Sequence, residues 1–219
     1  MKKYALLLTL VCFAFGASAQ GKIATYKYAY IWAQGNRSSG SKGSAFSSKD
    51  GQTYSLVNVL KKTSPKAIDI LCAYAKIDKK AEVGFCLFAP MTPDLEVNWD
   101  KNTGTIPYRY FEAPSSDPSG QSSLEKWAVR NATKIMTVTD IDFDNATYDS
   151  IAAIEMEENS YIAKNLEIGA IVAFETAATS SNPSKKGLIK IIKINDDERA
   201  EKVGQGNFQQ LEMIVKVQK

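Results

Sequence analysis

Cys72 and Cys86 carry the most reactive side chains in the part of the chain beyond its first dozen residues. A redox-active pair needs a CxxC spacing at the start of a helix, and a structural zinc site needs four ligands. These two cysteines lie in separate apolar, β-rich segments, and the chain has no histidine to complete a zinc site. The spacing therefore indicates a structural role, and it leaves two alternatives open: a disulfide or a pair of buried thiols.

The absence of histidine also restricts catalysis and metal binding. It excludes Ser-His-Asp and Cys-His nucleophile systems, HExxH zinc hydrolysis and imidazole metal sites. Asp140, Asp142 and Asp144 alternate as at the start of a calcium loop, but Asn145 and Ile151 stand where that loop needs glycine and glutamate. We therefore predict no metal, no cofactor and no catalytic residues. The alternative is a carboxylate-based hydrolase such as a glycosidase.

Aromatic and polar residues are interspersed in segment 91–121, which has no helical or strand periodicity. A structureless segment of this length in a compact domain is usually functional. Sugar-binding proteins stack pyranose rings on exposed Trp and Tyr faces, with Asp and Asn beside them to bond hydroxyls. We expect this loop either to bind a glycan or a partner protein or to be pinned to the core by its rings. The candidate ligand-binding residues are Asn98, Trp99, Asp100, Tyr108, Arg109 and Tyr110.

The first 19 residues have the pattern of a secretory signal peptide. Lys2 and Lys3 precede the apolar segment 4–16, and small residues follow at 17–19. A lipoprotein signal with acylated Cys12 needs a small residue before the cysteine, where this chain has Val11. We expect a periplasmic or secreted protein, with cell-surface association as a further alternative. No later segment is long and apolar enough for a transmembrane helix.

The charge of the chain is nearly balanced. Its formal net charge is +3, and removal of the two lysines of the leader lowers it to +1. A balance this close to neutral does not favour nucleic acid or an anionic membrane as a partner. An unidentified glycan or protein is therefore the expected partner.

The N-terminal part after the leader, residues 20–44, is expected to form one strand and a flexible loop. Tyr26, Tyr28, Tyr30 and Trp32 alternate within 24–33, which predicts a strand whose aromatic face belongs to the core. The following segment, 35–44, is rich in glycine and serine. Residues 45–219 are then expected to form a single domain.

The two cysteine-bearing segments are expected to pair as an antiparallel hairpin, because their linker is too short for a parallel crossover. A turn centred on Lys79 places Cys72 opposite Cys86.

Three helices are expected from capping signals. Ser55 caps a short helix with Leu56, Val59 and Leu60 facing inward. Ser122 and Glu125 form a capping box that opens a helix to about Asn131. Asp144 caps a helix over roughly 145–164.

The remaining elements are strands, and together they indicate the fold class. Residues 134–143 form one strand, and three more follow within 168–176, 187–195 and 211–219 with linkers too short for crossover helices. In the last of these, Leu211, Met213, Val215 and Val217 share one apolar face. We therefore predict an α+β fold, a mainly antiparallel sheet with two or three packed helices.

Several short motifs occur along the chain: Phe46 with Asp50, Gly51 and Tyr54; Ile68 with Asp69; Trp127 with Asn131 and Thr133; Phe174; and Lys186 with Gly187, Leu188 and Ile189. Their succession resembles a group of uncharacterised exported proteins and lipoproteins of gut-type Gram-negative bacteria, which carry a domain of unknown function. The resemblance covers most of residues 45–217 and implies no activity, cofactor or catalytic residue. Members often carry a lipidated cysteine after the signal, which is not expected in this chain.

Overall fold

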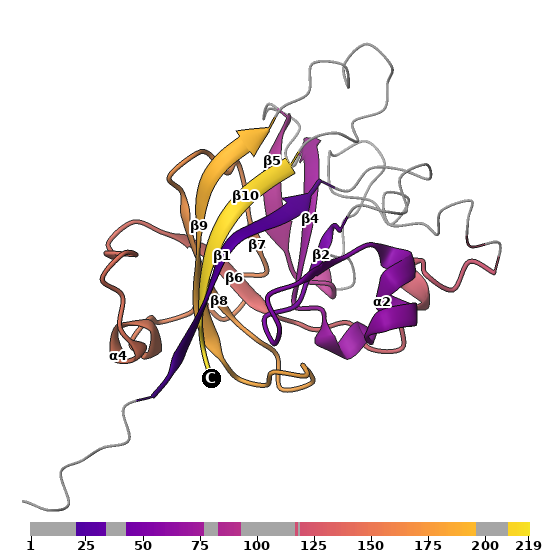
Figure 1. Cartoon of the computed structure of the whole chain (residues 1–219), viewed down its shortest axis with the longest axis horizontal. Helices are drawn as coiled ribbons and strands as arrows, with labels where there is room; N and C mark the ends of the chain where they lie inside the picture. The colour runs from indigo at the N-terminus through magenta and orange to yellow at the C-terminus, as the bar shows by residue number, and fades with distance from the viewer. Residues whose placement is uncertain (1–20, 34–42, 77–82, 93–116, 118, 196–209) are drawn as a thin grey trace, which may run out of the picture.

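The described residues form two antiparallel five-stranded sheets and two short α-helices (Figure 1). The computed structural model describes residues 21–33, 43–76, 83–92, 117, 119–195 and 210–219. The expected signal peptide, most of the 35–44 loop and all six candidate ligand-binding residues of the 91–121 loop lie outside this part of the chain. The expected α+β class is confirmed.

Sheet A has the strand order β1-β10-β9-β8-β6. Its strands are β1 (Ile23–Trp32), β6 (Lys134–Val138), β8 (Ile171–Glu175), β9 (Lys186–Asn195) and β10 (Gln210–Gln218). Successive pairing of β8, β9 and β10 confirms the antiparallel meander expected for the C-terminal strands. Leu211, Met213, Val215 and Val217 are all fully buried, as their alternation predicts. The first strand, β1, pairs with the last, β10.

Sheet B has the strand order β3-β2-β4-β5-β7. Its strands are β2 (Ala45–Phe46), β3 (Thr53–Tyr54), β4 (Ile70–Lys76), β5 (Val83–Phe88) and β7 (Ile162–Ala163). The expected hairpin of β4 and β5 is confirmed, but its register differs by one residue from the expected one. Cys72 lies opposite Leu87, and Cys86 lies opposite Ala73.

This shift places the two thiols on opposite faces of sheet B, so the expected facing pair is wrong. Both cysteines are free and fully buried. The Cys86 thiol donates to the carbonyl oxygen of Ala73 at 3.5 Å. Burial raises the pKa of Cys86 to about 12 and that of Cys72 well above its ordinary value. Of the two alternatives, the structure has the buried thiols.

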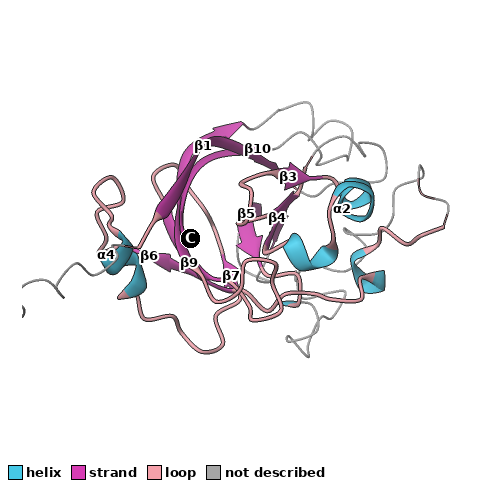
Figure 2. Ribbon diagram, turned by 60° about the horizontal axis from the view of Figure 1, so that its bottom comes forward, coloured by secondary structure: helices cyan, strands magenta, loops and turns pink. Residues whose placement is uncertain are grey.

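The two sheets curve around a shared core, which Figure 2 shows between the arc of β1, β10 and β9 and the strands β4 and β5. Fully buried side chains from both sheets meet there, including Phe46 of β2 and Phe174 of β8. A parallel bridge between Ile135 and Tyr161 joins the edge of sheet A to the residue that precedes β7 in sheet B. The sheets therefore form one packing unit.

A smaller cluster covers the outer face of each sheet, and the two helices lie outside the strands (Figure 2). Helix α2 (Leu56–Lys62) packs Leu56 and Val59 onto sheet B together with Leu124 and Trp127. Helix α4 (Tyr148–Ala152) packs Ile151 onto sheet A with Phe143. Within the described residues, no helix is long and apolar enough to cross a membrane.

The N-terminus of α2 confirms the expected cap, since the Ser55 side chain accepts a hydrogen bond from the Asn58 N–H. Leu56 and Val59 are buried as expected. Leu60 is 41% exposed, so its expected inward position is wrong. The helix has only two turns, and its apolar stripe is too narrow to bury a third residue.

The helix expected from Ser122 to about Asn131 is only a 3-10 turn, η3 (Leu124–Lys126). The capping box does not form, because the Ser122 N–H donates to Asp117 at 2.8 Å while Glu125 pairs with Lys126. The chain leaves the helical conformation at Trp127, whose ring is buried against sheet B. Tertiary burial of that ring outweighs the local helix signal.

The helix expected over 145–164 is also much shorter than expected. Thr147, and not Asp144, caps α4, through a reciprocal capping box with Ser150. The helix ends at Ala152, and Ile162 belongs to strand β7. A second 3-10 turn, η1 (Pro65–Ala67), follows α2 and leads into β4.

Candidate functional site

The described part of the chain presents a groove where β1 departs from regular pairing. Tyr26 lies opposite Val215, but Ala29 and not Tyr28 lies opposite Met213, so β1 contains a β-bulge. Tyr28 has a φ of 57°, in the left-handed region that a tyrosine rarely adopts. The extra residue changes which side chains face the core.

The bulge turns two tyrosines out to solvent. Ala29 and Ile31 are buried in the shared core, while Tyr28 is 61% exposed and Tyr30 is 43% exposed. The aromatic face expected in the core is therefore wrong for these two residues. Strict alternation from Tyr26, which is half-buried against the core, would have placed Tyr28 inward. One inserted residue reverses the alternation after it.

Gly51, in the turn before β3, brings the chain close to the Tyr26 ring across this groove. It has a φ of 72°, and a Cβ there would lie 2.2 Å from Cδ1 of Tyr26. The Tyr26 hydroxyl donates to the carbonyl oxygen of Lys49 at 2.9 Å and accepts from Lys219 Nζ at 2.6 Å. Tyr26 therefore forms a fixed wall of the groove.

The groove has a volume of about 400 Å³ and a mainly polar lining. The residues that line it include Lys27, Gln52 and Thr53 together with the three tyrosines. Desolvation and the neighbouring Glu212 carboxylate of β10, which is hydrogen-bonded to the phenol, raise the pKa of Tyr30. We name this site the tyrosine groove: Tyr26, Lys27, Tyr28, Tyr30, Gln52 and Thr53. It combines exposed ring faces with hydrogen-bonding groups.

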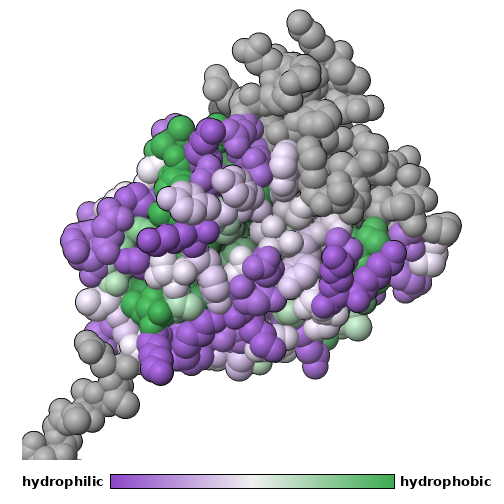
Figure 3. Space-filling view, viewed as in Figure 1, coloured by the Kyte–Doolittle hydropathy of each residue, from purple (hydrophilic) through white to green (hydrophobic). Residues whose placement is uncertain are grey.

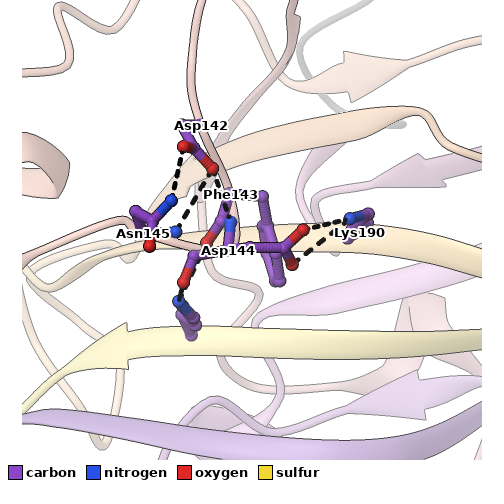
Figure 4. Close-up of polar contacts among 6 residues, drawn as sticks. Asp142, Phe143, Asp144, Asn145 and Lys190 are labelled. Carbon is purple, nitrogen blue, oxygen red and sulfur yellow. Dashed lines mark hydrogen bonds and ion pairs between the residues drawn. The ribbon is translucent and has the colours of Figure 1, made fainter.

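Two carboxylates of the acidic run 140–144 are bonded to neighbouring groups of the chain. Asp142 accepts hydrogen bonds from the backbone N–H groups of Asp144 and Asn145, while Asp144 forms a 3.0 Å ion pair with Lys190 (Figure 4). The ammonium groups of Lys190 and Lys216 lie over the Phe143 ring. These contacts hold the segment against sheet A. Across the described ranges, no three Asp, Glu or Cys side chains gather as metal ligands.

A second polar cluster, which the strand pattern did not reveal, is centred on the buried carboxylate of Asp69. Its Oδ2 accepts from the N–H and the hydroxyl of Ser48, and its Oδ1 accepts from the Ser180 hydroxyl at 2.6 Å. Asn131 donates weakly to Oδ1 and also to the carbonyl oxygens of Lys66 and Ile68. The network joins three distant segments and is closed to solvent, so we interpret it as structural.

Burial dominates the charge state of Asp69. Desolvation raises its pKa to about 6, although the hydrogen bonds from Ser180, Ser48 and Asn131 act in the opposite direction. A carboxylate that needs four donors to remain charged inside a protein is a costly element of a fold. No described groove opens onto it.

The motifs behind the family resemblance serve this framework. Phe46, Trp127 and Phe174 are core residues, and Asp69 and Asn131 are hydrogen-bonded to each other. A Cβ at Gly187 would lie 2.3 Å from Phe174 Cζ, so the close approach of β9 to that ring requires glycine. The shared motifs therefore support packing and carry no information about a ligand.

The fold is shared with a solved protein of unknown function. A crystal structure of a DUF4466 family protein from Parabacteroides merdae is similar with a TM-score of 0.53 and 15% identity, over 91% of this chain and 54% of that chain. The chain thus spans about half the length of the structure it matches. No protein-family profile and no curated protein matches the sequence. At this identity the similarity establishes the fold alone.

Proposed function

We propose that this chain is an exported, non-catalytic binding protein that takes a glycan at the tyrosine groove. The observation that supports the proposal is the outward display of Tyr28 and Tyr30 beside a polar groove, with a strained backbone at Tyr28. Backbone strain of this kind persists where the surrounding structure maintains it, and it is concentrated at functional sites.

The groove has the chemistry that a sugar ring requires. A pyranose presents apolar C–H groups on one face and hydroxyls around its edge. The exposed tyrosine rings offer a flat face for the former, and Lys27, Gln52 and Thr53 offer donors and acceptors for the latter. On the face drawn in Figure 3, hydrophobic side chains occur in separate patches within a mostly hydrophilic surface. A small polar ligand suits the groove better than a broad apolar interface does.

Two further elements of the proposal come from the sequence. The signal-like segment 1–19 supports export to the periplasm or beyond. The 91–121 loop, with Trp99, Tyr108 and Tyr110, stays a predicted second platform for the same ligand or for a protein. Its involvement and that of the groove are separable by mutation.

The binding experiment compares matched variants by isothermal titration with soluble bacterial and plant oligosaccharides, selected first on a glycan array. Tyr28→Ala is expected to weaken binding by about five-fold or more, because stacking of a sugar on an aromatic ring contributes on the order of 1 kcal/mol or more. Tyr28→Phe keeps the ring and should retain most of the affinity. Leu60→Ala, on the exposed side of α2, is the control for a truncated surface side chain.

The results distinguish three hypotheses: binding at the tyrosine groove, binding at the loop and glycosidase activity. Loss of binding in Tyr28→Ala supports the tyrosine groove, and loss only in Trp99→Ala moves the site to the loop. The alternative class, a glycosidase, needs two carboxylates about 5–10 Å apart. Carboxylates are absent from the described lining of the tyrosine groove. Release of reducing sugar from any bound oligosaccharide would overturn the non-catalytic assignment.

A further inference from the structure

A second groove lies at the opposite edge of sheet A, between β6 and the end of α4. Its volume is about 650 Å³, and it is open to solvent. Met136 and Val138 of β6 line it together with Ile141 and Ile154, and these four apolar side chains are only partly buried. The groove is separate from the tyrosine groove, and no residue lines both.

The β6 side of this groove is a strand edge that is paired only at Ile135. β8 occupies one edge of β6 along its whole length. On the other edge the Ile135 N–H donates to the carbonyl oxygen of Ser160 at 2.7 Å, and the Ser160 hydroxyl donates to the carbonyl oxygen of Ile135. Because backbone groups alternate in direction along an antiparallel strand, the N–H and C=O of Thr137 point the same way as those of Ile135. No described residue bonds them.

The walls of the groove carry negative charge. Asp140 follows β6, and Glu155 follows α4, so one carboxylate comes from each wall. Both side chains are exposed, and neither has an ion pair or hydrogen bond within the described residues. The nearby Lys186 ammonium is already bonded to the carbonyl oxygens of Ala152 and Ile154. The carboxylates thus favour a cationic ligand.

From these observations we infer that the β6 groove binds an extended peptide segment with alternating aliphatic and basic side chains, which adds a strand to the edge of sheet A. Main-chain bonds to Thr137 supply register, as in other cases of strand addition. Alternate side chains of an extended chain point to opposite sides. Its aliphatic side chains therefore enter the apolar floor while lysine or arginine side chains reach Asp140 and Glu155.

The test uses four variants and two fluorescent peptides of about seven residues, long enough to follow the edge of a five-residue strand. One peptide alternates valine with lysine, and the other alternates valine with glutamate. Thr137→Pro removes the outward N–H and leaves the ladder with β8 intact, whereas Thr137→Ala keeps that N–H and is its matched control. The double variant Asp140→Asn with Glu155→Gln removes the charge.

Fluorescence anisotropy is expected to show the lysine peptide binding at least about ten-fold more tightly than the glutamate peptide. Thr137→Pro should weaken that binding by about ten-fold and Thr137→Ala by no more than about two-fold. The double charge variant should weaken it similarly and remove most of its salt dependence. Glu157→Gln with Glu158→Gln removes two exposed charges outside the groove and should change little.

Two results would overturn the inference. The first is equal affinity for the two peptides, or unchanged affinity in both the proline and the charge variants. The second is a concentration-dependent dimer, seen by light scattering, that Thr137→Pro converts to monomer, because the edge would then bind a second copy of the chain. If circular dichroism shows that Thr137→Pro does not fold, the inference is tested by comparing the affinity of the charge variant for the lysine peptide with that of its control.

Discussion

At the scale of single residues, Asp69 is the side chain whose environment is most unusual. Its carboxylate is fully buried, and it links the β2–β3 turn through Ser48 to the 176–185 segment through Ser180. Hydrogen-bonded networks in a low-dielectric interior are stabilising only when all members are satisfied. Removal of the carboxylate would leave the donors of Ser48 and Ser180 without this acceptor, whereas Asn131 would keep the carbonyl oxygens of Lys66 and Ile68.

The raised pKa of Asp69 gives a pH dependence of stability with a definite sign. The folded pKa is about 6, against an ordinary value of 3.8, so between these values the folded state binds the proton more tightly. The free energy of unfolding therefore rises as pH falls through about 6, by about 1 kcal/mol between pH 7 and pH 5. Urea unfolding at the two pH values measures it.

Asp69→Asn is the matched variant for this measurement, since an amide does not titrate. We expect it to be less stable at both pH values, by about 1–3 kcal/mol, because its amide group faces the Ser48 donors. Its free energy of unfolding should also lack the increase between pH 7 and pH 5 that Asp69 gives to the unaltered protein. Parallel pH profiles for the two proteins would show that Asp69 is not the titrating group.

The tyrosines of β1 show what the residue pattern could and could not predict. Alternation of aromatic residues correctly predicts the strand, because period two is a property of the extended backbone itself. The bulge at Tyr28 has no such signature, since Tyr28 adopts a positive φ without a glycine. The site it creates was therefore expected in the core and was found at the surface. The loop residues proposed from the sequence lie outside the described ranges.

At the scale of elements, the β4–β5 hairpin was predictable but its register was not. One face of the hairpin buries Ile70 and Cys72 in the shared core, and the other buries Leu71 and Ala73 under α2 and Trp127. Hydrophobic patterning fixes register only where one face is polar. With two apolar faces, both registers bury similar side chains, so the hydrophobic pattern does not distinguish between them.

The register leads to a prediction for the two thiols. Buried, with raised pKa values and on opposite faces, they should react with iodoacetamide at neutral pH at least about 100-fold more slowly in the native protein than in urea. Mass spectrometry of the peptides that contain Cys72 and Cys86 follows the reaction. Denaturation without reductant should expose both as free thiols, and failure to label either one would reveal a disulfide.

Helix signals were reliable only where tertiary packing agreed with them. Ser55 caps α2 as expected because Leu56 and Val59 reach sheet B from that start. The Ser122 capping box was overridden by burial of Trp127, and Thr147 capped α4 in place of Asp144, whose carboxylate pairs with Lys190. Each local signal is worth about 1 kcal/mol, which is less than the burial of one large side chain.

At the scale of the whole molecule, the antiparallel class followed from short linkers, which forbid parallel crossovers. The division into two sheets did not follow, because neither the shared core cluster of Phe46 and Phe174 nor the pairing of β1 with β10 has a local signature. Strands far apart in the sequence pair in the arrangement that buries all of their apolar faces. No short stretch of the chain contains that information.

The shared core predicts that both sheets unfold together. Phe174→Ala removes a fully buried ring from sheet A and should lower the free energy of unfolding by about 3–5 kcal/mol. Far-UV circular dichroism and thiol labelling of Cys72 in sheet B should report the same midpoint. Ile168→Ala, at a position that is 64% exposed, should stay within about 0.5 kcal/mol of the unaltered protein. Separate midpoints for the two probes would indicate sheets that unfold independently.

The pairing of β1 with β10 bears on the time course of folding. Ile23 lies opposite Gln218, so the first strand has no neighbour in sheet A until the last strand has been synthesised. Contacts this distant along a chain close late and make folding slow. During synthesis β1 therefore remains without a strand partner, and any factor that binds unfolded chains has an extended interval in which to bind it.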